Sequence, residues 1–235
     1  MNILLYAIII IGVLTVFFKG FNIVAIILSI LLLAAFILRN NAIKKQIYSP
    51  LNNQLHILNV DKGGVFTLRG VGENAEDMTL KVVAKHLYQE GDYYWYELEC
   101  DKGTGENVWV EVEDDDNTVV SIMLKKLKLS DIGVTPSRLE QIDDNESGHI
   151  KYGGKTYEYA DSDNAVYYKF CDDKNPQKFY YWDFENGKYI ISVEKWSEDA
   201  VKIPSDVKFK PDYEVTLSQK LAKGQITVLS NYGEA

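Results

Sequence analysis

The chain has 235 residues and is acidic, with 34 Asp and Glu side chains against 25 Lys and Arg. Residues 1–45 hold four of the basic side chains and none of the acidic ones, so the rest of the chain carries 21 basic and 34 acidic side chains, a formal balance of −13. A surface of this sign repels polyphosphates, which excludes nucleic acid as a partner and leaves basic proteins or small cations.

The N-terminal region contains two apolar runs, residues 3–18 and 21–38, with Lys19 and Gly20 between them. A transmembrane helix needs about 20 predominantly apolar residues, and each run is at the short end of that range. We therefore expect residues 1–39 to form a two-helix transmembrane hairpin that contacts the lipid bilayer through residues 3–38. A cleaved signal peptide is the alternative for the first run, although no basic residue precedes it and no small-residue cleavage site follows. A single span over the second run is the other alternative.

Basic residues predict the orientation of this hairpin. Arg39, Lys44 and Lys45 follow the second run, against the single Lys19 in the loop. Because Lys and Arg favour the cytoplasmic side, both ends should face the cytoplasm of a bacterial inner membrane, together with the remaining chain.

After a polar tether over residues 40–54, short runs rich in β-branched and aromatic residues alternate with Gly, Asn and Asp turns, a pattern typical of antiparallel strands. Residues 136–142 are expected to be helical, with Thr135 as N-cap and Pro136 in the first turn. The predicted fold is mainly β: an antiparallel all-β region, arranged as a sandwich or an open barrel, with a first β unit at 55–130, a connector with a short helix at 131–147, and a second β unit at 148–235. We expect strands at 65–69, 80–88, 93–100, 107–113, 119–124, 149–152, 156–159, 165–171, 178–184, 189–195, 207–209 and 226–229.

Two stretches of this region resemble each other and suggest a duplicated three-strand meander. Residues 93–122 and 166–193 both run from an aromatic strand through Cys-Asp and a Trp strand to a β-branched strand that contains Ser121 or Ser192. The match has one inconsistency. Cys100 alternates with the apolar residues of its strand, whereas Cys171 does not, so the two cysteines face opposite ways. Each cysteine is otherwise interpreted as a small buried hydrophobic residue.

Three short aromatic elements carry a resemblance to a known family: 64–68 (GVFTL), 94–98 (YWYEL) and 108–113 (VWVEVE). Together with 150–157 and 189–196, they resemble the bacterial family catalogued as domain of unknown function 4178, over about residues 55–211. The resemblance implies β structure and no established activity or catalytic residues. It also implies a context of membrane-stress and polyamine-related proteins.

The sequence offers no catalytic, cofactor or metal motif. None of His56, His86 and His149 has a second ligand at metal-binding spacing, and neither a phosphate-binding glycine loop nor a nucleophile elbow is present. We therefore predict no cofactor and no metal ion.

One pattern predicts a ligand-binding face. Alternation places Trp95, Glu97 and Glu99 on one face of their strand, and a neighbouring strand does the same with three further residues, Trp109, Glu111 and Glu113. Tryptophan rings attract cations by roughly 0.5–2 kcal/mol each, and carboxylates add charge. The candidate ligand is an organic cation such as a polyamine. The alternative is that these tryptophans only cover the sheet.

Two functions therefore remain open. The first is a non-enzymatic binding or scaffold module with a protein partner or a small cation. The second is a hydrolase or transferase that uses carboxylates such as Glu97 and Glu111. An enzyme needs titratable groups with perturbed pKa values converging in a pocket, whereas a binding module can present a shallow aromatic face without them.

Overall fold

The computed structural model describes residues 30–35, 54–114, 118–197 and 212–232. The chain divides into two compact units, Met1–Pro50 and Leu51–Ala235. Within the described part of the second unit the elements are, in chain order, η1 (Ile57–Asn59), β1 (Gly63–Val71), β2 (Glu76–Glu90), β3 (Tyr93–Asp101), β4 (Asn107–Asp114), β5 (Thr118–Leu127), α3 (Pro136–Asp144), β6 (His149–Tyr152), β7 (Lys155–Tyr168), η2 (Lys169–Cys171), β8 (Gln177–Asn186), β9 (Tyr189–Ser197), β10 (Asp212–Leu221), η3 (Lys223–Gln225) and β11 (Ile226–Tyr232).

The predicted transmembrane hairpin is the part of the fold class that needs correction. In the part of the chain that the structure describes, no helix has the length and apolar character needed to cross a bilayer. Apart from residues 30–35, both apolar runs and most of the tether lie outside the described residues, and the cytoplasmic location stays a prediction.

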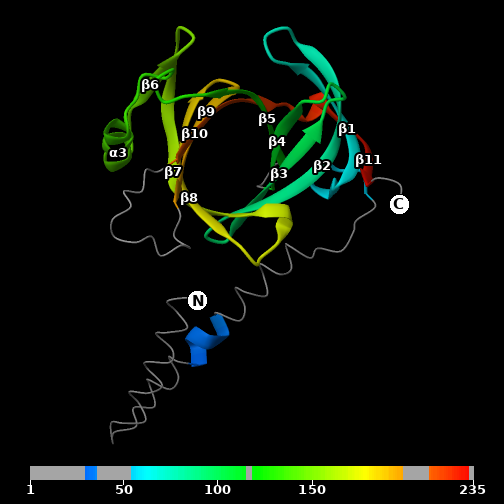
Figure 1. Ribbon diagram of the computed structural model, residues 1–235, viewed down its shortest axis with the longest axis horizontal. Helices are drawn as coiled ribbons and strands as arrows, with labels where there is room; N and C mark the ends of the chain where they lie inside the picture. The colour runs from blue at the N-terminus through cyan, green and yellow to red at the C-terminus, as the bar shows by residue number, and fades with distance from the viewer. Residues whose placement is uncertain (1–29, 36–53, 115–117, 198–211, 233–235) are drawn as a thin grey trace, which may run out of the picture. The chain divides into compact units, whose positions relative to one another are not determined.

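The antiparallel all-β prediction is confirmed. All eleven strands belong to one sheet in the order β11-β1-β2-β3-β4-β5-β10-β9-β8-β7-β6, and every pairing is antiparallel. The sheet closes on itself because β2 also pairs with β7, with Leu87 opposite Tyr168 and Gln89 opposite Val166. Eight strands therefore form a closed ring, seen end-on in Figure 1, while β1, β11 and β6 extend beyond it.

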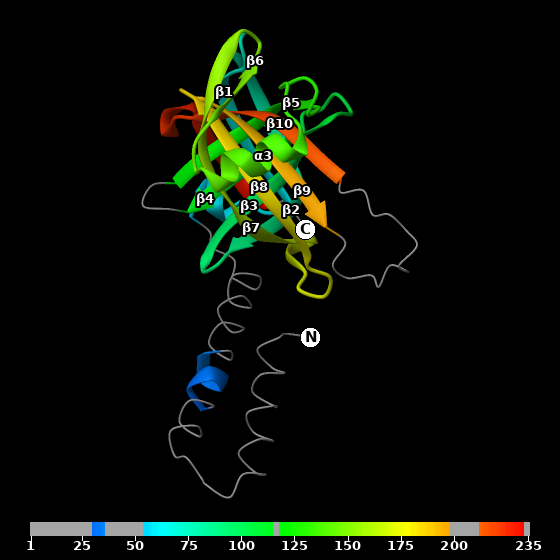
Figure 2. The ribbon, with the colours of Figure 1, turned by 90° about the vertical axis from the view of Figure 1, so that its left-hand side faces the viewer.

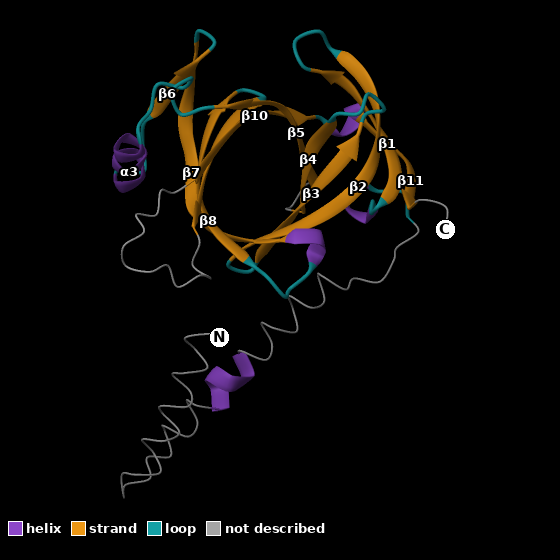
Figure 3. Cartoon of the chain, in the orientation of Figure 1, coloured by secondary structure: helices purple, strands orange, loops and turns teal. Residues whose placement is uncertain are grey.

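Two of the three apolar clusters in the described residues lie on the outside of this ring, and the third is an aromatic cluster around Tyr88 and Phe179 in the cavity wall. One core packs the outer side chains of β3, β4 and β5 against β1 and η1. The other packs the outer side chains of β8, β9 and β10 against α3 and β6, and Figure 2 shows α3 lying across these strands. Figure 3 shows the strands arranged around the ring, with α3 outside it. Because successive side chains of a strand point to opposite faces, every second side chain of the ring strands turns inward. The fully buried outer residues include Leu98, Val110, Val112, Ile122, Phe184, Ile191 and Val193.

Most predicted elements are present. The helix at α3 begins as expected, because the Thr135 side chain accepts a hydrogen bond from the Arg138 N–H at 3.3 Å. The strands expected at 156–159 and 165–171 are one long strand, β7, that ends at Tyr168. Strand β10 has no counterpart among the predictions, and the strand expected at 207–209 lies outside the described residues.

The internal repeat is shifted by one strand from the predicted match. Strands β1–β5 form one up-and-down meander and β6–β10 form another, which we call the first and second repeat. Their registers correspond across three strands: Glu97–Glu111–Ser121 in the first repeat, and Asp183–Ser192–Thr216 in the second. The first set of three residues lies on β3, β4 and β5, and the second set lies on β8, β9 and β10. Ser121 therefore corresponds to Thr216, and Ser192 corresponds to Glu111.

The predicted match aligned the Trp strands instead, β4 with β8. Trp109 lines the inside of the ring, whereas Trp182 is 3% exposed and packs in the outer core. A repeat must preserve which face a side chain occupies, so the match of β4 with β8 is wrong, as the inconsistency between Cys100 and Cys171 indicated. Cys171 itself lies in η2, beyond the end of β7. Cys100 is buried in the first core, and both cysteines are free thiols.

Candidate functional site

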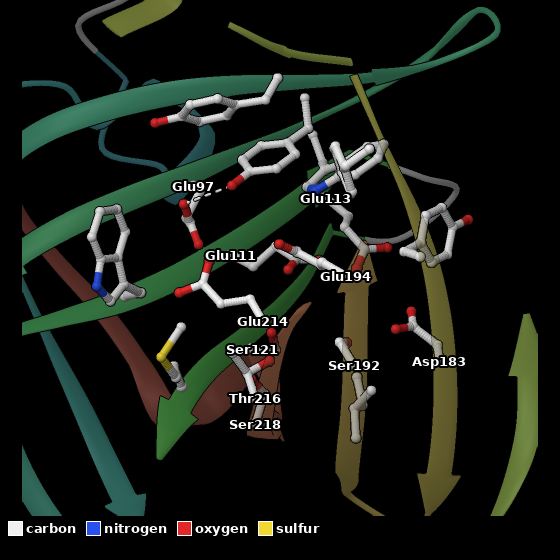
Figure 4. A pocket seen from close by; sticks show the side chains of 18 of the residues that line it. Glu97, Glu111, Glu113, Ser121, Asp183, Ser192, Glu194, Glu214, Thr216 and Ser218 are labelled. Carbon is white, nitrogen blue, oxygen red and sulfur yellow. Dashed lines mark hydrogen bonds between the residues drawn. The ribbon is translucent and has the colours of Figure 1, made fainter. Parts of the chain in front are cut away.

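The inner faces of the eight ring strands enclose a cavity of about 790 Å³. Every ring strand contributes side chains to its wall, and Figure 4 shows carboxylates and hydroxyls from several strands turned toward one shared space. Ten carboxylates, eight aromatic rings and two lysines line it. They are Glu90, Glu97, Glu111, Glu113, Asp161, Asp183, Glu185, Glu194, Asp212 and Glu214; Tyr88, Tyr93, Trp95, Trp109, Tyr167, Phe179, Tyr181 and Trp196; and Lys126 and Lys220.

The two lysines neutralise only part of this charge. Lys220 Nζ donates to Glu185 Oε1 at 2.6 Å, and Lys126 pairs with Glu214. Among the described residues, the other eight carboxylates of the wall form no ion pair. The cavity therefore carries an excess of negative charge that no positive side chain of the described structure offsets.

Burial, together with this excess of charge, raises the pKa values of several of these carboxyl groups. Burial raises the pKa of Glu97 and of Asp183 to about 7, and burial together with the neighbouring Glu97 raises the pKa of Glu194 to about 8. The pKa of Glu111 is raised well above its usual value, first by burial and then by the charges of Glu113 and Asp183. These groups interact across the cavity, because Glu97 and Glu111 belong to the first repeat and the other two to the second.

Aromatic rings form a continuous surface beside these carboxylates, where β2 meets β7. Trp95 stacks on Tyr88 with ring centroids 5.3 Å apart, and Trp196 stacks on Phe179 at 4.7 Å. Tyr167 joins the two stacks, at 5.0 Å from Tyr88 and 5.7 Å from Trp196. Stacking fixes these rings in place without a ligand, so their faces and edges form a preformed wall.

Tyrosine hydroxyls hold several carboxylates in position. Tyr88 donates to Glu97 Oε2 at 3.0 Å, and Tyr93 donates to Glu113 Oε2 at 3.1 Å. On the other side, Tyr181 donates to Glu90 Oε2 at 2.6 Å. An ionised carboxylate has about four acceptor positions, so one such bond leaves capacity for an incoming donor.

The structure brings together most of the predicted ligand face. Glu97 is opposite Glu111, Trp95 is opposite Glu113, and all four line the cavity together with Trp109. Glu99 does not line it. Its Oε1 accepts a hydrogen bond from the Asn107 side chain at 2.6 Å, and its Oε2 lies 3.9 Å from His86 Nε2.

Sequence reasoning missed the part of the wall that the second repeat supplies. The same alternation was present there, since Tyr181, Asp183 and Glu185 share one face of β8, and Glu194 and Trp196 share one face of β9. This alternation alone does not predict the second wall, because the faces of the two repeats form one cavity only through the pairing of β2 with β7.

In the described ranges no cluster of three or more His, Cys, Asp or Glu side chains is arranged to hold a metal ion. Titratable groups with raised pKa values do converge in the cavity, which is the feature that the sequence analysis associated with an enzyme. All four carboxyl groups shift in the same direction, however, whereas an acid–base pair needs pKa values pushed apart.

A family model described as Domain of unknown function (DUF4178) matches residues 75–203, which is more than half of the chain. The matched part contains β2 to β9, so seven of the eight ring strands and most of the cavity wall lie within it. No curated protein and no solved structure matches the chain. On the family match, and in agreement with the resemblance of its aromatic strands, the chain belongs to the DUF4178 family.

Proposed function

We propose that this protein is a non-enzymatic binding module that takes up an organic polycation in the cavity of its strand ring. The observation that carries the proposal is the combination of eight carboxylates without an ion-pair partner among the described residues and a preformed aromatic surface in one cavity. A ligand pocket is typically concave, largely preformed and supplied with a few convergent polar groups.

The chemistry of the wall favours an organic ammonium ion over other cations. Aromatic faces attract ammonium groups by roughly 0.5–2 kcal/mol each, and their apolar surface accepts methylene groups between the charges. A metal ion needs several oxygen ligands in one tight shell. Cations of the polyamine type match a wall to which seven of the eight ring strands contribute carboxylates and six contribute aromatic rings.

Proton release should accompany binding. Carboxyl groups with pKa values of about 7 to 8 are partly protonated in the free protein at neutral pH. A bound cation favours the ionised form and lowers these pKa values, so protons leave as the ligand enters. Affinity should therefore rise between about pH 6 and pH 8, while aliphatic amines remain charged because their pKa is about 10.

Titration of the full-length chain with spermidine tests the proposal. We expect the fluorescence of Trp95 and Trp109 to change on binding, and the response to weaken as salt is added. The double variant Glu97→Gln, Glu111→Gln should abolish the response, and Trp95→Ala should weaken binding by about 2- to 30-fold, the equivalent of one cation–π contact. Mg²⁺ at matched ionic strength should not reproduce the change.

A matched control removes the same number of charges elsewhere. Glu140 and Glu158 are exposed and do not line the cavity, so Glu140→Gln, Glu158→Gln should leave the titration unchanged. Equal losses in both double variants would mean that spermidine only screens the surface charge, and the proposal would be wrong.

A carboxylate-dependent hydrolase or transferase is the second candidate, because Glu97 and Glu111 are directly opposite on adjacent strands and both have raised pKa values. The same titration distinguishes the two functions when the ligand is recovered afterwards and its molecular mass is measured by mass spectrometry. A binding module returns the amine unchanged, whereas an enzyme returns a product. The predicted protein partner stays a prediction.

A further inference from the structure

We infer that the cavity contains two equivalent half-sites, one from each repeat, and that its ligand is a linear amine with a cationic group at each end. The inference rests on the proposed function and adds which class of organic cation the cavity selects. It follows from the strand registers, which relate the wall residues of the two repeats in pairs.

Two carboxylates and a ring are repeated in each half-site. Glu97 corresponds to Asp183, and Glu113 corresponds to Glu194, because each acid occupies the same position on the matching strand. An aromatic residue stands opposite the second acid in both repeats: Trp95 faces Glu113, and Tyr181 faces Glu194. Each half-site thus has a ring beside two carboxylates, which is sufficient to hold one ammonium group.

The correspondence between the two repeats also holds where they meet, at the pairing of β5 with β10. Where β5 pairs with β10, Ser121 is opposite Lys220, and Thr216 is opposite Lys126. Ser121 and Thr216 are equivalent, so the two cavity lysines are equivalent as well. A bulge in this pairing, between Leu217 and Ser218, accommodates the one-residue difference in spacing.

The lysines also balance the charge of the two half-sites. Both pair with acids of the second repeat, Glu185 and Glu214. The first repeat has no acid at the position of Glu214, where Val119 stands, and its counterpart of Glu185 is Glu99, which is not in the wall. Glu185 and Glu214 are therefore neutralised, whereas the repeated pairs, like Asp161 and Asp212 of the second repeat, form no ion pair among the described residues and remain for a ligand.

A further difference between the half-sites lies on β4 and β9. Glu111 of the first repeat corresponds to Ser192 of the second, which gives the first half-site an additional carboxylate. The first half-site should consequently bind an ammonium group more tightly than the second. Replacement Glu111→Ser should make the two half-sites alike.

Stoichiometry tests this inference on the full-length chain by calorimetry, with 1-butylamine and 1,4-diaminobutane as probes of equal carbon length. We expect two butylamine molecules per chain, in a tighter and a weaker step, and one diaminobutane molecule bound at least 10-fold more tightly, because linking the two ends makes the second contact intramolecular. Longer diamines locate the best span between the half-sites.

Single variants assign the steps. Glu97→Gln should remove the tighter butylamine step, Asp183→Asn should remove the weaker one, and each should reduce the affinity for the diamine to within about 3-fold of that for the monoamine. Glu111→Ser should merge the two butylamine steps into one. Far-UV circular dichroism identifies any variant that fails to fold, and Glu111→Ser then still decides the question, since it places in the first repeat the residue that the second already has.

The outcomes separate this inference from the proposed function. Amine binding with one butylamine per chain, or with equal affinity for both amines, would overturn the two half-sites and leave the cation-binding function intact. Absence of any amine or spermidine response would overturn both.

Discussion

The outer and inner faces of the ring strands are built from adjacent residues of the same segments, yet they have opposite chemistry. On β9, Ile191 and Val193 are fully buried in the outer core. Ser192 and Glu194, which alternate with them along the strand, line the cavity. Apolar burial on the outside supplies the stability, at about 25 cal/mol for each Å² removed from water. The inner face is thereby free to hold like charges that disfavour folding, which is the usual compromise at a functional site.

The strongest test of this division compares two adjacent isoleucines. Ile191 is 0% exposed in the outer core, whereas Ile190 lines the cavity and is half-buried. We expect Ile191→Ala to lower the free energy of unfolding by about 2–5 kcal/mol, because it leaves a void in a packed core. Ile190→Ala should cost less than half as much, since the cavity already adjoins its side chain. Urea denaturation measures both, and equal losses would contradict the assignment of stability to the outer face.

The second test uses pH. Carboxyl groups such as Glu97 and Asp183 have folded-state pKa values of about 7, above the usual 4.5 and 3.8, so the folded state binds more protons than the unfolded state between about pH 4 and pH 7. Stability should fall as pH rises through that window, and the whole penalty is present above about pH 8. For each group we expect a loss of up to about 3 kcal/mol.

Variants identify the groups responsible for the pH effect. Glu97→Gln and Asp183→Asn should each flatten the fall in melting temperature between pH 5 and pH 8, whereas Glu140→Gln, on the exposed face of α3, should leave it unchanged. A protein that becomes more stable over this range would show that the inner carboxylates are not crowded as described.

How much of this could be read from the sequence depends on the range of the interaction. Alternation in β3 and β4 is local, so the positions of Trp95, Glu97, Trp109 and Glu111 followed from period-two patterning, and the Thr135 cap located α3. Closure of the ring is non-local, because the residues of β2 and β7 that pair are about 80 positions apart in the sequence. No local pattern reports such a contact, and the other wall of the cavity therefore could not be predicted.

Strand β10 shows a second kind of limit. Its outer residues Val215 and Leu217 alternate with Glu214, Thr216 and Ser218, a strand pattern of low overall hydrophobicity. A hydrophobic search passes over a strand whose inner face is polar because it faces a cavity. The polar inner face of β10 is therefore the reason that this strand could not be predicted from hydrophobicity.

The smallest expected effect concerns the two equivalent lysines of the cavity. Their replacement tests how far positive charge on the inner face limits cation binding. Lys220 has a side chain that is 35% exposed and pairs with Glu185, whereas Lys126 is 59% exposed and pairs with Glu214. Each replacement by Gln frees one carboxylate and makes the cavity more negative, so binding of spermidine should tighten. Because solvent screens exposed pairs, which are worth at most about 1 kcal/mol, we expect a gain of about 2- to 5-fold for Lys220→Gln and a smaller gain for Lys126→Gln.

Lys151→Gln, at an exposed position of β6 outside the cavity wall, is the control and should change nothing beyond the effect of net charge. Weaker binding in the Lys220 variant would mean that this lysine holds the second half-site in shape, and the ordering of the three variants by calorimetry decides between charge and architecture.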